Sequence, residues 1–412
     1  MLSLLASVAL LTTSVPVQPT SHSCDLCVSR PAFVEEILLS IQEKEVDPQE
    51  KKKREEAEKR LKDDIQRDIE LGKQAEEEID KQLKASTDLD ATARLQAIGA
   101  EIAEIANQDA VSVLWGDQRH STFEYKFKLV QGEDVNAFSL PGGTIYFFEG
   151  LLKFAESDDE LAGVVAHEIS HAAFRHVATL QREQAKFSLA TLPLVIAAAM
   201  SGGNRDAVNA LMAAQLVGAG VSSGWSVQAE TSADYGGIQY LRKSRYNPVG
   251  VLTFMERLGY RERLSPQIDW GIYRTHPPTN ERAQFIIRSL NEFGVPIKRS
   301  STTTSLSARS IPGSDGSYTI WFGDHSIATY RGEGAKDRAA RSVIRLNSFL
   351  DAVPQMFQMT TDGDAILGNG RALIELGSTD LAEGESVEKE RDDALVSLRR
   401  VISELNMRLW RI

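Results

Sequence analysis

The feature that most constrains this chain is the sequence His167-Glu-Ile-Ser-His171, which follows an apolar run typical of a buried helix. Ser157-Asp-Asp-Glu160 stands ten residues upstream and has the spacing of an N-terminal capping box. Residues four apart on an α-helix differ by only about 40° in direction, so His167 and His171 point to the same side. Two imidazoles placed in this way can share one metal ion, and the pattern therefore predicts a metal site on a helix.

Glu168 lies about 100° further round the same helix, where it can reach a water molecule held by the metal without ligating the metal itself. The positions three and six residues after His171 hold Phe174 and Val177, which excludes the extended pattern in which a third histidine follows. We expect His176, which lies on a different helix face, to pack beside the site or to hydrogen-bond behind the ligands.

The better candidate for a third ligand is Glu230, in the sequence Ala229-Glu-Thr-Ser-Ala-Asp234. Glu230 and Asp234 are again four residues apart, so they share one face of a predicted helix. Glu230 can ligate a metal, while Asp234 can accept the second N–H of a ligand histidine and fix its tautomer.

A further cluster is Thr275-His276-Pro277-Pro278, followed by Arg282 at the start of a predicted helix. His276 has two alternative roles if it faces the metal. It can donate a hydrogen bond to a tetrahedral oxyanion, with Arg282 completing a paired clamp, or it can occupy the fourth position on zinc. The alternative is an ordinary loop histidine followed by a surface arginine.

Residues 135–146 predict a strand, a tight turn at Pro141-Gly-Gly and a second strand, because glycine supplies the positive φ that such a turn needs. A strand beside an active site can pair with an extended peptide through backbone hydrogen bonds. Asn136, Ala137 and Phe138 are therefore candidate substrate-binding residues. The alternative is an ordinary hairpin without a role in binding.

Taken in order, the motifs V-N-A-F-S-L-P-G-G, H-E-I-S-H, E-T-S-A-D and T-H-P-P-T-N-E-R resemble the gluzincin zinc metallopeptidases of the HtpX and CAAX prenyl-protease type. The likeness runs from about Thr92 to Leu290 and is closest to the soluble exported members of the BepA and LoiP kind. It implies one Zn²⁺ per chain, a general base, a carboxylate behind the ligands and two further active-site residues. These are His167, His171 and Glu230 for zinc, Glu168 as base, Asp234 behind the ligands, and His276 with Arg282.

The resemblance implies an exported endopeptidase, periplasmic or associated with the cell envelope, that hydrolyses protein or peptide substrates in envelope protein quality control. The competing interpretation is a non-catalytic, zinc-stabilised chaperone or scaffold, which has no need of a base such as Glu168. The net charge of −12 argues against a nucleic-acid partner, which calls for a basic surface. The sequence gives no indication of oligomeric state.

The N-terminal part of the chain is expected to hold an export signal and a charged helix. An apolar stretch over residues 2–11 predicts a signal peptide within residues 1–23, and Cys24 and Cys27 follow it as a thiol pair or a local disulfide. Residues 33–90 predict a charged helical stalk with a thin apolar stripe, interrupted at Gly72. This helix is either a partner-binding coiled coil or a solvated helix laid on the catalytic domain.

The remaining chain is expected to fold as α+β. Residues 91–298 predict a mainly helical, zincin-like metallopeptidase domain with a small β-hairpin or sheet. Within it the apolar segment 187–221 is either part of the core or a helical hairpin that acts as a lid or makes peripheral membrane contact. After a Ser- and Thr-rich linker at 299–310, residues 311–412 predict a small α+β domain with two hairpin–helix units, which serves either partner recruitment or stability.

Overall fold

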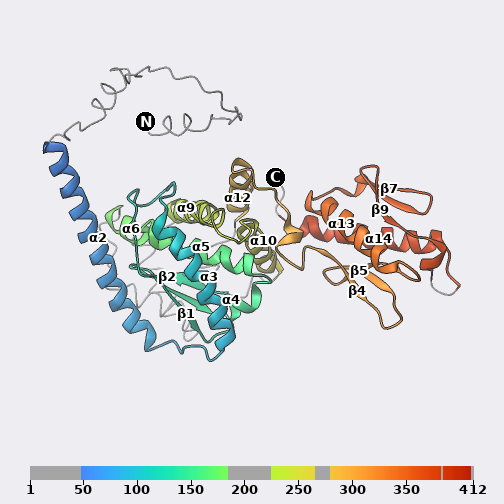
Figure 1. Ribbon diagram of the computed structural model, residues 1–412, viewed down its shortest axis with the longest axis horizontal. Helices are drawn as coiled ribbons and strands as arrows, with labels where there is room; N and C mark the ends of the chain where they lie inside the picture. The colour runs from blue at the N-terminus through green and yellow to red at the C-terminus, as the bar shows by residue number, and fades with distance from the viewer. Residues whose placement is uncertain (1–47, 184–223, 265–278, 382–383, 410–412) are drawn as a thin grey trace, which may run out of the picture. The chain divides into compact units, whose positions relative to one another are not determined.

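The computed structural model describes residues 48–183, 224–264, 279–381 and 384–409, and the chain is mainly helical with small sheets (Figure 1). It divides into two compact units, residues 1–58 and 59–412. The expectations for residues 1–23, Cys24, Cys27, residues 187–221 and His276 lie outside the described residues. No helix within the described ranges is both long enough and apolar enough to cross a membrane.

Helix α5 (Asp158–Ala173) carries the H-E-I-S-H sequence and is central to the larger unit. Its N-terminus is capped as predicted, because the Ser157 hydroxyl accepts a hydrogen bond of 3.1 Å from the Glu160 amide. In a capping box the Glu160 side chain would also accept a hydrogen bond from the Ser157 amide, but here it has other partners. The Glu160 carboxylate accepts from the Glu156 amide at 2.9 Å and from Arg257 at 2.5 Å, so the arginine decides where this side chain lies.

Three helices pack directly on α5, and a fourth packs on two of those three. The three are α3 (Leu89–Gln108), α9 (Gly224–Leu241) and α10 (Val249–Leu264), and the fourth is α12 (Asn280–Glu292). The apolar face of α3 that the sequence predicts, with Leu95, Ile98 and Ile102, is buried in the same core as the apolar face of α5. Short helices α4 (Glu149–Phe154) and α6 (His176–Glu183) flank α5 in the chain.

A three-stranded sheet of order β1-β3-β2 lies against these helices. Strands β2 (Ala137–Ser139) and β3 (Thr144–Phe148) form the predicted antiparallel hairpin, and the turn between them has Gly142 and Gly143 at φ of 84° and 97°. Strand β1 (Lys126–Val130) pairs with β3 in parallel and was not predicted. Because β3 is central, β2 is the strand at one edge.

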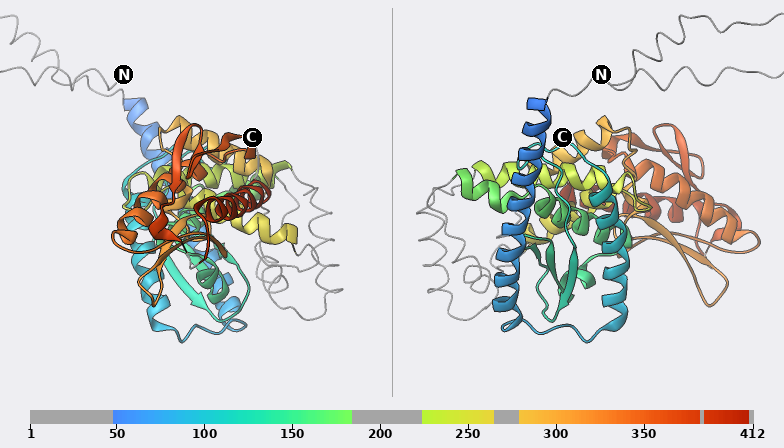
Figure 2. Two further views of the ribbon diagram at one scale, coloured as in Figure 1. Left: turned by 90° about the vertical axis from the view of Figure 1, so that its right-hand side faces the viewer. Right: turned by 60° about the vertical axis from the view of Figure 1, so that its left-hand side comes forward.

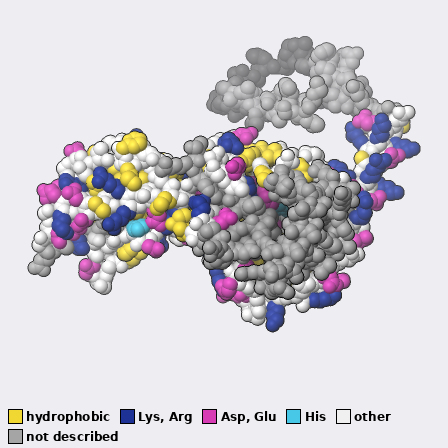
Figure 3. All heavy atoms as spheres, turned by 180° about the vertical axis from the view of Figure 1, so that it is seen from behind, with side chains coloured by type: hydrophobic (Ala, Val, Ile, Leu, Met, Phe, Trp, Pro, Cys, Tyr) yellow, Lys and Arg dark blue, Asp and Glu magenta, His cyan; other side chains and the backbone are white. Residues whose placement is uncertain are grey.

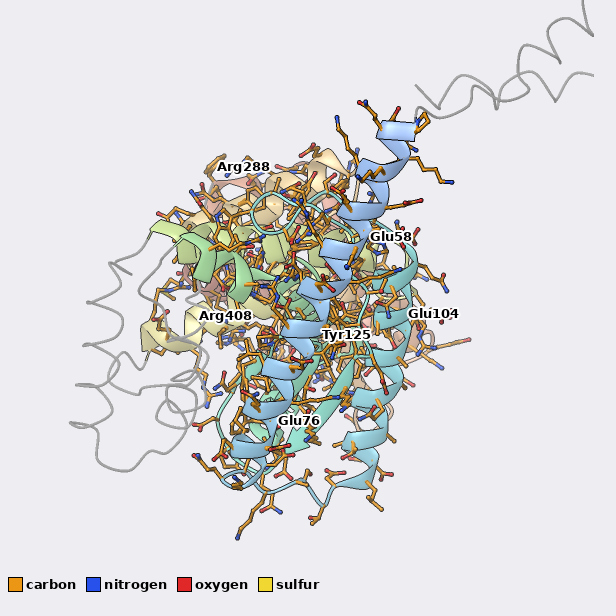
Figure 4. All side chains as sticks on the ribbon, turned by 90° about the vertical axis from the view of Figure 1, so that its left-hand side faces the viewer. Glu58, Glu76, Glu104, Tyr125, Arg288 and Arg408 are labelled. Atoms are coloured by element: carbon orange, nitrogen blue, oxygen red, sulfur yellow. The ribbon has the colours of Figure 1, made fainter. Side chains whose placement is uncertain are left out.

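Helix α2 (Pro48–Asp80) covers the outer face of this sheet from residue 59 onward. Alternate side chains of β3 point to opposite faces: Ile145 and Phe147 join the main core, whereas Tyr146 and Phe148 pack against Ala75 of α2. Figure 4 shows α2 crossing the strands with Glu76 at the level of the sheet, and Figure 2 shows α2 and α3 flanking the sheet. Residues 59–80 thus belong to the fold, in agreement with a helix laid on the domain.

The exposed side of α2 explains the composition of this segment. Side chains of both charge signs cover the part of the helix that faces solvent (Figure 3). Four positions of the helix are buried, and they are Asp68, Gly72, Ala75 and Ile79. A narrow contact stripe with a wide charged face is what a single surface helix requires.

The chain after residue 299 forms two small antiparallel sheets and two helices around one core. The first sheet has strands β4 (Ala308–Pro312), β5 (Tyr318–Phe322) and β6 (His325–Tyr330), and α13 (Ala335–Asp351) follows it. The second has β7 (Met359–Asp362), β8 (Ala365–Gly368) and β9 (Arg371–Glu375), and α14 (Val387–Arg408) follows it. Each expected hairpin therefore has an additional leading strand.

The segment 299–310, expected to be a linker, is instead fixed in place. Arg299 forms a buried ion pair with Glu256 of α10, with N···O distances of 2.7 and 2.8 Å. The Thr302 carbonyl accepts from the Ser157 hydroxyl at the start of α5, and Ala308 already belongs to β4. The Ser and Thr residues that suggest a flexible linker serve here as hydrogen-bonding groups.

Candidate metal site

The three predicted ligands meet where α5 packs along α9. The ligand atoms of His167, His171 and Glu230 all lie within 4.8 Å of one another. The Nε2 atoms of the two histidines are 3.1 Å apart, and each lies 3.2 to 3.3 Å from one oxygen of the Glu230 carboxylate. The helix brings the two imidazoles to one face, and only the packing of α9 brings the carboxylate to them.

Asp234 lies behind His167, as predicted from its spacing to Glu230. Its carboxylate is 2.9 Å from Nδ1 of His167 and is 1% exposed. Nδ1 therefore donates to Asp234, and Nε2 is the nitrogen that can ligate a metal once it has lost its proton. Burial alone lowers the pKa of His167, but the hydrogen bonds and charges of Asp234 and Glu230 outweigh it and raise the pKa to about 10.

His171 is held by a second chain of hydrogen bonds. Nε2 of His176 lies 2.9 Å from the Trp115 carbonyl, which can only accept, so this nitrogen carries the proton. Burial, reinforced by the neighbouring His171, lowers the pKa of His176 well below its ordinary value and keeps the ring neutral. Nδ1 of His176 then accepts from Nδ1 of His171 at 2.9 Å, and the Nε2 lone pair of His171 faces the site.

Arg282 lies in the first turn of α12, after the N-cap Thr279, and is 2% exposed. Its Nε and Nη2 donate to the two oxygens of Asp234 at 2.9 and 2.8 Å, and its Nη1 lies 3.0 Å from Glu230. The guanidinium thus joins the ligand carboxylate to the carboxylate that orients His167. The clamp in which Arg282 pairs with His276 involves a residue outside the described ranges.

Glu168 is 1% exposed and lines a pocket together with His167, Asp234 and Arg282. The remaining walls are mostly apolar, and they are Gly163, Val164, Val251, Phe254, Met255 and Leu258. Burial lowers the pKa of Arg282, but the charges of Asp234 and Glu230, with a smaller contribution from Glu168, outweigh burial and raise it. A carboxylate beside the metal ligands can accept a proton. The mostly apolar pocket can receive one apolar side chain of a bound molecule.

The donor set fits zinc. Two neutral imidazole nitrogens and one carboxylate oxygen are a frequent ligand set of catalytic zinc, which keeps its fourth position open. Both histidines present Nε2, because each Nδ1 is engaged behind the site. The ligand atoms of the three side chains lie within 4.8 Å of one another, so all three can bind one ion.

The candidate substrate strand is the edge strand β2. Asn136, Ala137 and Phe138 are all buried, and the Phe138 ring stacks on Tyr146 with ring centroids 5.0 Å apart. The Phe138 ring belongs to the same apolar cluster as Ala75 and Ile79 of α2. Only the backbone groups of Phe138 are therefore available at the edge of the sheet. Among the described residues, the buried side-chain oxygen of Asn136 has no hydrogen-bond partner.

Two residues around the site, Trp115 and Arg175, were not found from the sequence. Trp115 contributes a backbone carbonyl, and its amide and carbonyl are both bonded by the Ser232 hydroxyl, two residues after Glu230. Arg175, between His171 and His176, is 6% exposed and forms ion pairs with Asp68 and Asp117. No spacing rule marks a backbone carbonyl, and an arginine after a helix is unremarkable in sequence.

A mainly helical domain that joins H-E-x-x-H to a glutamate from a second helix has the arrangement of a gluzincin. The resemblance to this class is confirmed: residues 92–289 match the family model of peptidase family M48. The chain therefore contains an M48 domain, which occupies just under half of its length.

Parts of several known proteins are similar to part of this chain. Beta-barrel assembly-enhancing protease of Escherichia coli is 29% identical over 163 residues, which are 38% of this chain and 33% of that protein. Metalloprotease LoiP of Escherichia coli is 31% identical over 172 residues, 41% of this chain and 64% of LoiP. Mitochondrial metalloendopeptidase OMA1 of Schizosaccharomyces pombe is 29% identical over 174 residues, 42% of this chain and 48% of that protein. The chain thus spans about a third of the length of the first relative.

Proposed function

We propose that this chain is a zinc-dependent endopeptidase that cleaves protein or peptide substrates in the cell envelope. The observation that carries the proposal is the convergence of the His167, His171 and Glu230 ligand atoms within 4.8 Å, with Glu168 on the same helix. The M48 domain and the names of its relatives, which include an assembly-enhancing protease and a metalloprotease, support the same activity.

The ligands would hold zinc, which when bound polarises a peptide carbonyl and lowers the pKa of water. Glu168 then takes a proton from the attacking water and passes it to the leaving amine. Asp234 and His176 keep the Nδ1 protons of the two ligand histidines in place. Arg282 is a positioning residue, since its contacts are to the carboxylates of Asp234 and Glu230.

Substrate would lie along β2 as an added strand. An edge strand offers free backbone groups on one side, and an extended peptide can pair with them. The mostly apolar pocket beside Glu168 would receive one apolar side chain of the peptide. His276 would act close to the zinc, either as a hydrogen-bond donor to the oxyanion or as a fourth ligand.

Two observations bear on the competing idea of a zinc-stabilised chaperone or scaffold. Glu168 is buried beside the ligands and lines the same pocket as His167, where its carboxylate can act on a bound water. The described residues supply two histidines and a glutamate as ligands, a set typical of catalytic zinc, whereas a structural zinc takes four protein ligands. Both favour the peptidase.

The test is cleavage of a peptide library by the purified full chain, with Glu168→Gln as the inactive variant. We expect one zinc per chain in both proteins and a loss of about 100-fold or more in cleavage for Glu168→Gln. Glu104→Gln, an exposed change on α3, is the matched control and should cleave as wild type does. Zinc binding without Glu168-dependent cleavage would favour the scaffold instead.

A further inference from the structure

Arg175 stands at the point where the chain reverses between α5 and α6. Its φ is +50°, a left-handed conformation that glycine adopts freely and other residues adopt at a cost. The turn carries His176 back over His171, with the ring centroids 4.8 Å apart. An arginine at a position that suits glycine suggests that the side chain itself has a role.

The guanidinium of Arg175 is held by carboxylates from two distant parts of the chain. Nε and Nη2 donate to the two oxygens of Asp68 at 2.5 and 3.2 Å, and Nη1 donates to Asp117 at 2.7 Å. Asp68 belongs to α2, and Nη2 also reaches the Asp64 carbonyl on that helix at 3.2 Å. A forked contact of this kind fixes the direction of the guanidinium as well as its position.

The loop Trp115–Asp117 connects this ion pair to the ligand histidine. The Asp117 amide donates to the Phe174 carbonyl at 2.7 Å, while the Asp117 carboxylate holds Arg175. Gly116 lies so close to the turn that a Cβ there would stand 2.6 Å from the Phe174 carbonyl oxygen. Trp115, one residue earlier, supplies the carbonyl that orients His176.

We propose that Asp68 and Arg175 are positioning residues for the zinc ligand His171. The path runs from Asp68 through Arg175 to the turn that carries His176, whose Nδ1 accepts the Nδ1 proton of His171. If the turn loosens, His171 loses the acceptor that keeps its Nε2 lone pair directed at the metal. The charged helix α2 thereby contributes to metal affinity from a distance. This inference rests on the proposed zinc site.

The first experiment measures the zinc dissociation constant of the full chain by competition with a chromophoric chelator. We expect Asp68→Asn, which keeps the shape but removes the charge, to raise it by about tenfold or more. Asp80→Asn is the control on the same helix, where Asp80 pairs with Lys128 and Tyr146 at the sheet. We expect its zinc affinity to equal that of wild type.

Two further variants separate the backbone from the side chain of Arg175. Arg175→Gly relieves the left-handed strain but removes the guanidinium, so we expect weaker zinc binding despite the more suitable backbone. Arg175→Lys keeps the positive charge but loses the forked contact of the guanidinium with Asp68. It replaces Asp68→Asn in the measurement if that variant does not fold. The Co²⁺-substituted proteins should show an altered visible absorption spectrum in Asp68→Asn and Arg175→Gly, and the wild-type spectrum in Asp80→Asn.

Wild-type zinc affinity in both Asp68→Asn and Arg175→Gly would overturn the proposal. Equal weakening in Asp80→Asn would also overturn it, because the effect would then come from docking of α2 in general. Neither result affects the proposed function. That proposal fails only if the wild-type chain binds no zinc or if Glu168→Gln cleaves peptides as wild type does.

Discussion

Gly72 of α2 lies against Pro141 so closely that a Cβ on Gly72 would stand 1.8 Å from the Pro141 carbonyl oxygen. This is the point where the charged helix crosses the turn between β2 and β3. The glycine that interrupts the apolar stripe in the sequence therefore lets the helix approach this turn, and Ala75 and Ile79 pack with side chains of the sheet.

Gly72→Ala should destabilise the protein by about 1–3 kcal/mol, the usual cost of overpacking. The sign is informative, because alanine favours a helix over glycine by about 1 kcal/mol. The measurement is urea unfolding, with Lys73→Ala as the control at the exposed neighbouring position. A more stable Gly72→Ala protein would show that α2 does not press on the turn.

His176→Ala should weaken zinc binding by about 10- to 100-fold while leaving all three ligands in place. The reason is that Nδ1 of His171 loses the acceptor 2.9 Å away. His120→Ala is the matched control, since His120 bonds the Ala106 carbonyl and has no contact with the ligands in the described structure. Chelator competition measures both, and equal affinities would assign His176 to packing alone.

Zinc binding at neutral pH should release about one proton from His167. With a pKa raised to about 10, this histidine is protonated in the metal-free protein and must lose a proton to ligate. Affinity should therefore rise with pH. Asp234→Asn removes one cause of the raised pKa, so fewer protons should be released. Titration calorimetry in two buffers of different ionisation enthalpy counts them, and no proton release from wild type would contradict the prediction.

The contribution of Asp117 to stability should disappear in acid. Burial raises its pKa, but the hydrogen bonds of Arg119 and the charges of Arg119 and Arg175 outweigh burial and lower it to about 2. A lowered carboxyl pKa stabilises the fold above the unfolded value of about 3.9, and the gain is lost as pH falls towards 2. It amounts to about 2 kcal/mol.

The pH dependence is measured by urea unfolding of wild type and Asp117→Asn. The difference in unfolding free energy should be constant above pH about 5 and should shrink as pH falls below about 4. A difference that stays the same in acid would mean that the Asp117 charge does not stabilise the fold.

His276→Ala distinguishes the two roles expected of that residue. If His276 is a fourth ligand, the variant should cleave a loose peptide faster than wild type. If it donates to the oxyanion, kcat should fall while KM changes little. The contacts of Arg282 with Asp234 and Glu230 give no preference between these roles. Unchanged kinetics would return His276 to an ordinary loop residue.

Local patterns in the sequence were sufficient for the features that depend on near neighbours. The cap at Ser157, the shared face of His167 and His171, and the hairpin through Gly142 follow from helix and turn geometry over a few residues. The motif order also identified the family, because several motifs in one sequence are far more specific than any one of them.

Pairings between distant segments were decided by tertiary structure. Strand β1 is not apparent in the sequence because each of its residues pairs with a residue of β3 that lies 18 positions further along the chain. Strand β4 resembles a linker in the sequence because it follows directly on a segment rich in Ser and Thr. The Ser and Thr residues of segment 299–310 look alike in sequence whether they face water or, like Ser300 and Thr303, hydrogen-bond a carboxylate of another segment.

The sequence by itself was enough to predict which side chains would supply the proposed chemistry, since ligand type and helical spacing are local properties of His167, His171 and Glu168. Only the tertiary structure decided how they are held. Asp68 meets Arg175 across more than 100 residues, and the Trp115 carbonyl meets His176 across about 60. Neither contact leaves a local pattern in the sequence. A buried charge or N–H needs a partner, but that partner can come from any segment that packs against it.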